Sequence, residues 1–193
     1  VPTMKIDAEF VNLADYIIIP AFCDEATIEG ILNLLDDIDL NKVLAIQINR
    51  FRPRVIEMKY REVLEKMKKK EVVVRVFDIG ADKEVPYLLQ EKEKNPALGI
   101  RGIRLCLREI ALFKAQIRAL LRASLYGNLS ILLPMISSIE EVLETKKIIE
   151  QCKEELMQEG QAYSEKISLG IMVEVPALLF ILEDIAKEVD FFS

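Results

Sequence analysis

Residues 72–102, VVVRVFDIGADKEVPYLLQEKEKNPALGIRG, combine a strand, a polar turn and a long loop in a pattern that decides the fold class. The apolar run that carries Arg75 is typical of a strand buried on both faces of a parallel sheet. The turn that follows contains Lys83, and the loop ends at Arg101, where a helix is predicted to start. The stretch therefore brings three cations toward one end of a sheet, as the binding of a small, highly charged anion requires.

Apolar segments of the same kind alternate with helical patterns along the rest of the chain. Such alternation predicts a parallel sheet covered by helices. A capping box is predicted where Ser138 is followed three residues later by Glu141. Strands are predicted at residues 14–20, 43–49, 72–78, 129–135, 168–173 and 189–192, and helices around 28–35 and at 54–70, 100–123, 138–159 and 176–187.

Two closures of such a sheet are possible, an open doubly wound sheet and a (β/α) barrel. No Gly-x-Gly-x-x-Gly follows the first predicted strand, so a dinucleotide fold has no positive support. Arg75, Asp78 and Glu174 all fall at the carboxyl ends of strands, where barrel enzymes carry their chemistry. A complete barrel has eight units and about 250 residues. We therefore predict that residues 1–193 form one α/β domain, a (β/α)8 TIM-type barrel that is incomplete, with about six units.

Composition excludes several classes of function. The net charge of -6 argues against a nucleic-acid partner, and no apolar run reaches the roughly 18 residues that membrane insertion requires. Three scattered cysteines fit a reducing cytoplasm, and Cys106 and Cys152 are expected to be buried thiols. The chain has no histidine, which excludes a Ser-His or Cys-His nucleophile, a histidine-ligated metal and a phosphohistidine within these residues.

Several ordered motifs resemble enzyme I of the bacterial phosphoenolpyruvate:sugar phosphotransferase system. The resemblance is clear for residues 59–193 and weak for residues 1–50. Its motifs are RVFDIGADK at 75–83, NPALGIRGIR at 95–104, QIRALLRAS at 116–124, LPMIS at 133–137, GIMVEVP at 170–176 and VDFFS at 189–193.

The resemblance implies a phosphoenolpyruvate (PEP)-binding (β/α)8 barrel that depends on Mg²⁺ and forms a homodimer. It implies that a histidine in another domain of the same polypeptide takes the phosphoryl group and that a phosphocarrier protein is the partner. Arg75 and Arg101 match arginines that hold the substrate phosphate. Lys83 matches a basic residue of the active-site loop whose role is less defined, and Glu174 matches one of two acidic Mg²⁺ ligands.

Two departures from the family pattern limit what this chain is expected to do alone. The family's Arg-Thr-Glu-Phe-Leu strand is missing. Arg50 and Arg52 are candidates to replace its arginine, although their spacing differs from the family pattern. The Asn-Asp pair with the second Mg²⁺ ligand and the strand with the catalytic cysteine would lie beyond Ser193. We therefore expect the chain alone to be inactive in phosphoryl transfer.

Other interpretations of the same residues stay open at the level of sequence. Asp78 can pair with Arg75 or Lys83 and hold the turn, while helical arginines, namely Arg104, Arg108, Arg118 and Arg122, can form ion pairs or a dimer surface. A second hypothesis is a non-catalytic, dimerising assembly module of this fold, since open strand edges favour pairing. A third is an Mg²⁺-dependent lyase or aldolase barrel that acts on a 2-keto acid.

Overall fold

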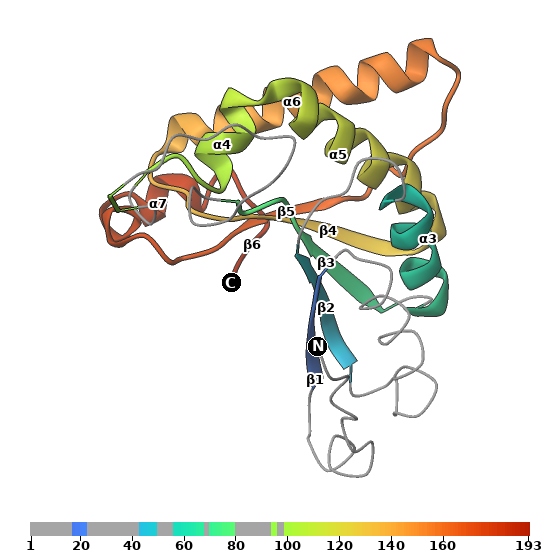
Figure 1. Ribbon diagram of the computed structural model, residues 1–193, viewed down its shortest axis with the longest axis horizontal. Helices are drawn as coiled ribbons and strands as arrows, with labels where there is room; N and C mark the ends of the chain where they lie inside the picture. The colour runs from blue at the N-terminus through green and yellow to red at the C-terminus, as the bar shows by residue number, and fades with distance from the viewer. Residues whose placement is uncertain (1–16, 23–42, 50–55, 68–69, 80–93, 96–98) are drawn as a thin grey trace.

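The computed structural model describes residues 17–22, 43–49, 56–67, 70–79, 94–95 and 99–193, and it shows a mixed α/β fold. The strands form one six-stranded sheet in the order β1-β2-β3-β4-β5-β6, and every neighbouring pair is parallel (Figure 1). The strand bounds are β1 Ile17–Phe22, β2 Val43–Asn49, β3 Glu71–Arg75, β4 Asn128–Leu133, β5 Ser168–Ile171 and β6 Phe191–Phe192.

From β2 onward, helices connect consecutive strands, and they cover one side of this sheet. In Figure 1, α3, α5 and α6 lie side by side, and α5 contacts both of the others. The helix bounds are α3 Ile56–Met67, α4 Ile103–Arg108, α5 Ile110–Ala123, α6 Ile139–Gln158 and α7 Leu182–Ile185, with single 3-10 turns η1 Ser124–Tyr126 and η2 Pro176–Phe180.

The strand order distinguishes between the two closures that the sequence left open. A doubly wound sheet reverses its strand order at a switch point, whereas the strands here follow one another without reversal. Arg75 is in register with Leu132, and Leu132 with Gly170, so the carboxyl ends of β3, β4 and β5 meet at one edge. The predicted parallel α/β fold is confirmed, while closure into an eight-unit barrel stays a prediction.

The core lies between the sheet and the helices that cover it. Val72 and Val74 of β3 are buried, and most of β4 is buried as well. The ring of Phe77, just after β3, meets the ring of Phe113 on α5 edge to face, with centroids 6.3 Å apart. The side chains that α3 and α5 contribute to this core include Tyr60, Val63, Leu64, Met67, Ile117, Leu120 and Leu121.

Two predicted helices are wrong in detail. The span predicted at 100–123 begins only at Ile103 and is divided at Glu109, whose backbone leaves the helical region at φ -98° and ψ 57°. The helix predicted at 176–187 is instead the 3-10 turn η2 followed by the single-turn helix α7, separated at Ile181. Since η2 leaves Phe180 91% exposed, the apolar spacing there does not reflect burial against one face.

The remaining boundaries agree to within a few residues, and the predicted start of α6 is confirmed. Strand β1 begins three residues later than predicted, and the predicted helix around 28–35 lies outside the described residues. At α6 the Glu141 carboxylate accepts hydrogen bonds from the backbone N–H groups of Ser137, at 2.6 Å, and Ser138, at 3.1 Å. This capping box fixes the point at which the chain leaves β4 and enters the helix.

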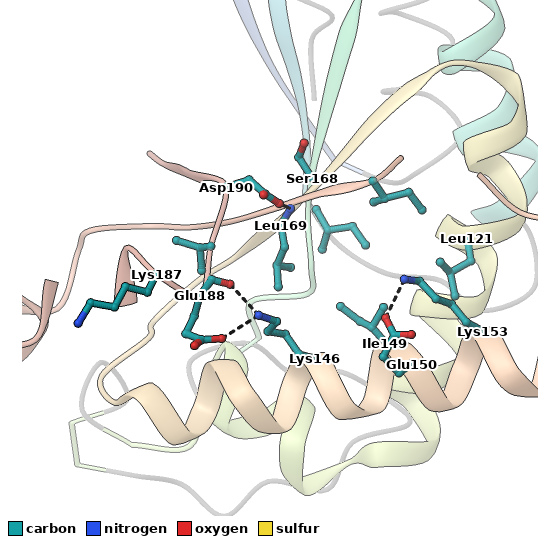
Figure 2. A pocket seen from close by; sticks show the side chains of 13 residues that line it. Leu121, Lys146, Ile149, Glu150, Lys153, Ser168, Leu169, Lys187, Glu188 and Asp190 are labelled. Atoms are coloured by element: carbon teal, nitrogen blue, oxygen red, sulfur yellow. Dashed lines mark hydrogen bonds and ion pairs between the residues drawn. The ribbon is translucent and has the colours of Figure 1, made fainter. Parts of the chain in front are cut away.

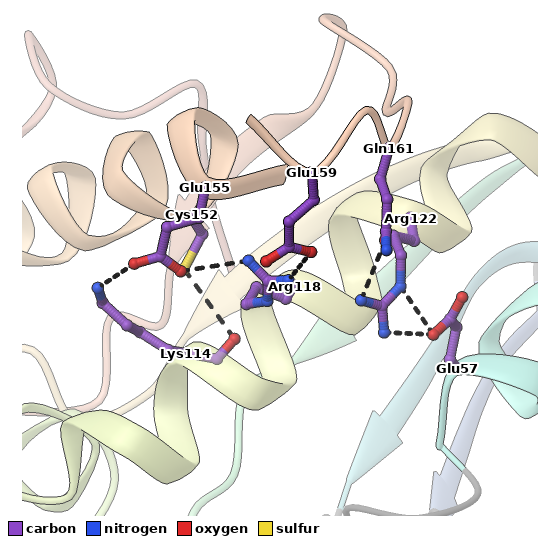
Figure 3. A network of polar contacts seen from close by, with 8 residues as sticks. All are labelled: Glu57, Lys114, Arg118, Arg122, Cys152, Glu155, Glu159 and Gln161. Carbon is purple, nitrogen blue, oxygen red and sulfur yellow. Dashed lines mark hydrogen bonds and ion pairs between the residues drawn. The ribbon is translucent and has the colours of Figure 1, made fainter. Parts of the chain in front are cut away.

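Charged side chains join α5 to its neighbours on the outer surface (Figure 3). Arg118 pairs with Glu155, in the C-terminal part of α6, at 3.2 Å and with Glu159, the residue directly after α6, at 2.6 Å. Arg122 pairs with Glu57 of α3. The ion-pair interpretation of these two arginines is confirmed. No helix in the described part of the chain has the length and apolar character needed to cross a membrane.

Candidate functional site

Asp78 joins the two arginines that the sequence singled out. It lies three residues after Arg75, where the chain has left β3, and its carboxylate forms an ion pair with the Arg75 guanidinium. From the far side of the long loop, Arg101 donates from Nε to Oδ1 at 3.2 Å and from an Nη to Oδ2 at 3.1 Å. Two guanidinium groups thus share one carboxylate, and this cluster, which we call the arginine clamp, keeps a net positive charge.

The clamp is partly shielded from water. The side chains of Arg75, Asp78 and Arg101 are 16%, 12% and 19% exposed. Nε of Arg75 is buried and has no hydrogen-bond acceptor among the described residues. Because a buried donor costs about 1–3 kcal/mol when it is unsatisfied, the clamp favours a further anion as its neighbour.

The loop reaches the clamp through a close approach at Gly102. The guanidinium of Arg104 donates to the Gly99 carbonyl at 2.7 Å, which fixes the backbone just before Arg101. Gly102 has φ +54°, and a Cβ built there would lie 2.8 Å from Cγ of Met135 and 3.3 Å from Oδ1 of Asp78. The absence of a side chain therefore lets the Arg101 segment lie directly against the end of β4.

Glu174 follows β5 and lies at the same edge of the sheet. Its Oε1 accepts a hydrogen bond of 2.7 Å from the backbone N–H of Met135, which follows β4. Met135 has a positive φ of 62° and contacts the Gly102 region. Glu174 and the arginine clamp are thus linked across the exits of β3, β4 and β5.

The surroundings of Glu174 fit one ligand of a hard divalent cation. The side chain is exposed and uses one carboxylate oxygen for the Met135 contact. Within the described residues no group of three or more potential metal ligands occurs. Mg²⁺ commonly takes one or two carboxylates and completes its shell with substrate oxygens and water, so a single exposed carboxylate is compatible with it.

Comparison with known proteins identifies the family. Residues 38–193 match the family described as PEP-utilising enzyme, PEP-binding domain. The chain belongs to this family. The match covers the clamp, the loop and Glu174, so the residues discussed above all lie within the PEP-binding domain.

The curated relatives of this PEP-binding domain are named phosphoenolpyruvate-protein phosphotransferase. Identity is 56% to the protein from Bacillus subtilis, 54% to that from Staphylococcus epidermidis and 53% to that from Geobacillus stearothermophilus, each over 134 residues and 69% of this chain. The chain spans only 24% of the Bacillus subtilis protein and 23% of the other two.

Of the four site residues predicted from sequence, three are placed in this PEP-binding domain. Arg75 and Arg101 meet on Asp78, and Glu174 lies at a neighbouring strand exit. Lys83 lies outside the described residues, as do Arg50 and Arg52. From the sequence, Asp78 was named as a possible pairing partner, but Gln116 was given no role. The signal for Gln116 was a polar amide among the apolar positions of a predicted helix, where a buried side chain needs hydrogen-bond partners.

A pocket of about 310 Å³ lies at the opposite end of the strands (Figure 2). Ser168, the first residue of β5, and Asp190, just before β6, line it together with α6. Lys146 and Lys153, which reach into it, pair with Glu188 at 2.8 Å and Glu150 at 2.7 Å. Its charges are balanced, so it lacks the excess of positive charge found at the clamp.

Both cysteines in the described part of the chain are free, buried thiols, as expected from the sequence. Burial raises the pKa of Cys106 well above its usual range, and the nearby Asp78 carboxylate adds to the rise. Burial raises the pKa of Cys152 to about 11, with a further contribution from Glu155. Neither thiol is therefore an activated nucleophile at neutral pH.

The Cys152 thiol predicts a loss of stability in alkaline solution. Its pKa is about 11 in the folded chain and about 8.5 when unfolded, so its contribution is complete below about pH 8.5 and is lost as the pH rises toward 11. We expect the free energy of unfolding, measured by urea denaturation, to fall less between about pH 8 and pH 10.5 in Cys152→Ala than in the unaltered chain. Equal falls in the two proteins would contradict this assignment.

Proposed function

We propose that this chain is the PEP-binding domain of a phosphoenolpyruvate-protein phosphotransferase. In this reaction the phosphoryl group of PEP passes to a protein histidine outside the chain. The observation that carries the proposal is the arginine clamp, which lies at the carboxyl edge of the sheet in a member of the PEP-binding-domain family. The names of the curated relatives support the same reaction.

The clamp suits the phosphate of PEP by charge and by shape. A guanidinium can donate two parallel hydrogen bonds to a phosphate, and such charge-assisted bonds are the stronger class. Asp78 holds Arg75 and Arg101 in place before substrate arrives, so little side-chain entropy is lost on binding. Lys83 is the proposed third cation, supplied by the loop that follows Asp78.

Glu174 is the proposed protein ligand for Mg²⁺ in this chain. The ion, when bound, would neutralise charge on the substrate oxygens during phosphoryl transfer. Met135 orients the carboxylate through its backbone N–H, which leaves the second oxygen available. Positioned cations supply most of the catalysis in such reactions, since the transition state disperses its charge over the phosphoryl oxygens.

The closure of the barrel and the assembly of the parent protein are proposed from membership of the family. We propose that the domain closes as a (β/α)8 barrel when all its units are present and that the parent protein is a cytoplasmic homodimer served by a phosphocarrier protein. The sequential strand order supports the barrel, and the exposed side chains of Leu179 and Phe180 offer apolar surface for a dimer. The 193 residues alone are proposed to bind PEP but not to transfer its phosphoryl group.

Glu174→Gln tests the proposed metal ligand. We expect Mg²⁺ to tighten PEP binding to the unaltered 193-residue chain, measured by isothermal titration calorimetry, and to have little effect on the variant, because a neutral amide is a poor Mg²⁺ ligand. The matched control is Glu165→Gln, which removes an exposed carboxylate away from the strand exits and should keep the Mg²⁺ effect. An undiminished Mg²⁺ effect in Glu174→Gln would remove this residue from the site, and absent PEP binding in the unaltered chain would overturn the proposed function.

A further inference from the structure

A buried glutamine in α5 connects three elements behind the arginine clamp. Gln116 is 1% exposed. Its Oε1 accepts a hydrogen bond of 3.1 Å from the backbone N–H of Phe77, and its Nε2 donates one of 3.1 Å to the hydroxyl of Tyr60 on α3. Because a buried amide is costly unless it is hydrogen-bonded, these contacts define a single orientation for the side chain.

At Phe77 the hydrogen-bond partners of the backbone change from the neighbouring strand to the covering helices. The backbone N–H of Val76 still donates to the Leu132 carbonyl of β4, at 3.0 Å. One residue later, the Phe77 N–H donates to Gln116 and its carbonyl accepts from the Cys106 thiol of α4, at 3.6 Å. The two backbone polar groups of Phe77 are thus bonded to side chains of the covering helices.

The next residue is Asp78, so the position of Phe77 sets the position of the clamp. The Asp78 carboxylate holds Arg101 through two hydrogen bonds of 3.2 and 3.1 Å. Hydrogen bonds of this kind are lost within a few tenths of an ångström beyond these distances. A small displacement of the Phe77 backbone would therefore move Asp78 and weaken its contacts with both Arg75 and Arg101.

We propose that Gln116 is a positioning residue for the phosphate-binding arginines and acts through the Phe77 backbone and Asp78. The inference rests on the proposed function, since it takes Arg75 and Arg101 as the phosphate ligands. It assigns a role in substrate affinity to a side chain that is buried in the core beneath the site. A purely structural role would instead lower stability and leave the affinity unchanged.

Three variants separate positioning from stability. Gln116→Met keeps the length of the side chain but removes the acceptor for Phe77. Tyr60→Phe removes the other contact of the same amide and leaves the Phe77 contact in place. Thr145→Val is the matched control, because Thr145 is also fully buried and polar but donates to a carbonyl of its own helix, α6.

The first measurement is the dissociation constant of PEP for the full 193-residue chain, by calorimetry with Mg²⁺ present. We expect Gln116→Met to raise it about tenfold, below the roughly hundredfold cost of misplacing a group by a full ångström. Tyr60→Phe is expected to change it much less, and Thr145→Val not at all. An unchanged constant in Gln116→Met, or equal losses in Gln116→Met and Thr145→Val, would overturn the proposal.

The second measurement requires no substrate, so it separates failure of this inference from failure of the proposed function. Nitrogen-15 NMR follows solvent exchange of the Arg101 Nε–H, which is protected by its hydrogen bond to Asp78. Exchange should accelerate in Gln116→Met and stay unchanged in Thr145→Val. Unchanged exchange in Gln116→Met would overturn the positioning role. If exchange were faster in Gln116→Met but the unaltered chain did not bind PEP, only the assignment of the substrate would be overturned.

Discussion

Replacing Arg101 with methionine is expected to weaken PEP binding by about a hundredfold, since hydrogen bonds to charged groups contribute about 1.5–3 kcal/mol each. The Arg101 side chain is 19% exposed, and its guanidinium is held by Asp78 in a fixed orientation. Methionine fills a similar volume without charge or donors. The dissociation constant of PEP for the 193-residue chain, measured by calorimetry with Mg²⁺, checks this expectation.

Two further variants show whether charge or geometry carries the Arg101 effect. Arg101→Lys keeps the positive charge but loses the planar fork, so binding should be intermediate between the unaltered chain and Arg101→Met. Arg122→Met removes an arginine that pairs with Glu57 on the outer surface, and it should leave PEP affinity unchanged. If Arg101→Met bound PEP as well as Arg122→Met does, the clamp would not be the phosphate site.

Replacing Phe77 with alanine is expected to lower the free energy of unfolding by about 3–5 kcal/mol. The ring is fully buried and packs edge to face against Phe113. Its removal would leave a cavity between β3 and α5 in addition to the lost burial of apolar surface. The midpoint of urea denaturation, followed by circular dichroism, measures the change.

Phe180→Ala is the matched control for this loss, because it makes the same substitution on a side chain that is 91% exposed. A surface change of this kind is expected to stay within about 0.5 kcal/mol. Comparable losses at both positions would mean that Phe77 is not part of the packed core. A large loss at Phe180 alone would show that this side chain is covered in solution, as a dimer contact would require.

Local patterns in the sequence were sufficient for the α/β class and for most of the elements. Apolar runs of strand length, separated by helical spacing, predicted the parallel sheet, and Ser138 with Glu141 predicted the start of α6. Both features depend on neighbouring residues, which a sequence displays directly. The helix predicted at 176–187 was wrong because η2 exposes Leu179 and Phe180, and the sequence does not show which apolar residues find a partner.

The residues of the candidate site could be located from the sequence, but the contacts between them could not. The sequence by itself placed Arg75, Arg101 and Glu174 at strand exits and loop ends, because residue type and strand direction are enough to locate them at one edge of a parallel sheet. Three contacts became known only from the folded chain: Asp78 holds both arginines, Met135 orients Glu174, and Gln116 holds Phe77 from the core. These contacts join residues from 23 to 39 positions apart, apart from the Arg75–Asp78 pair. Their distances depend on how strands and helices pack, which no local pattern of residues specifies.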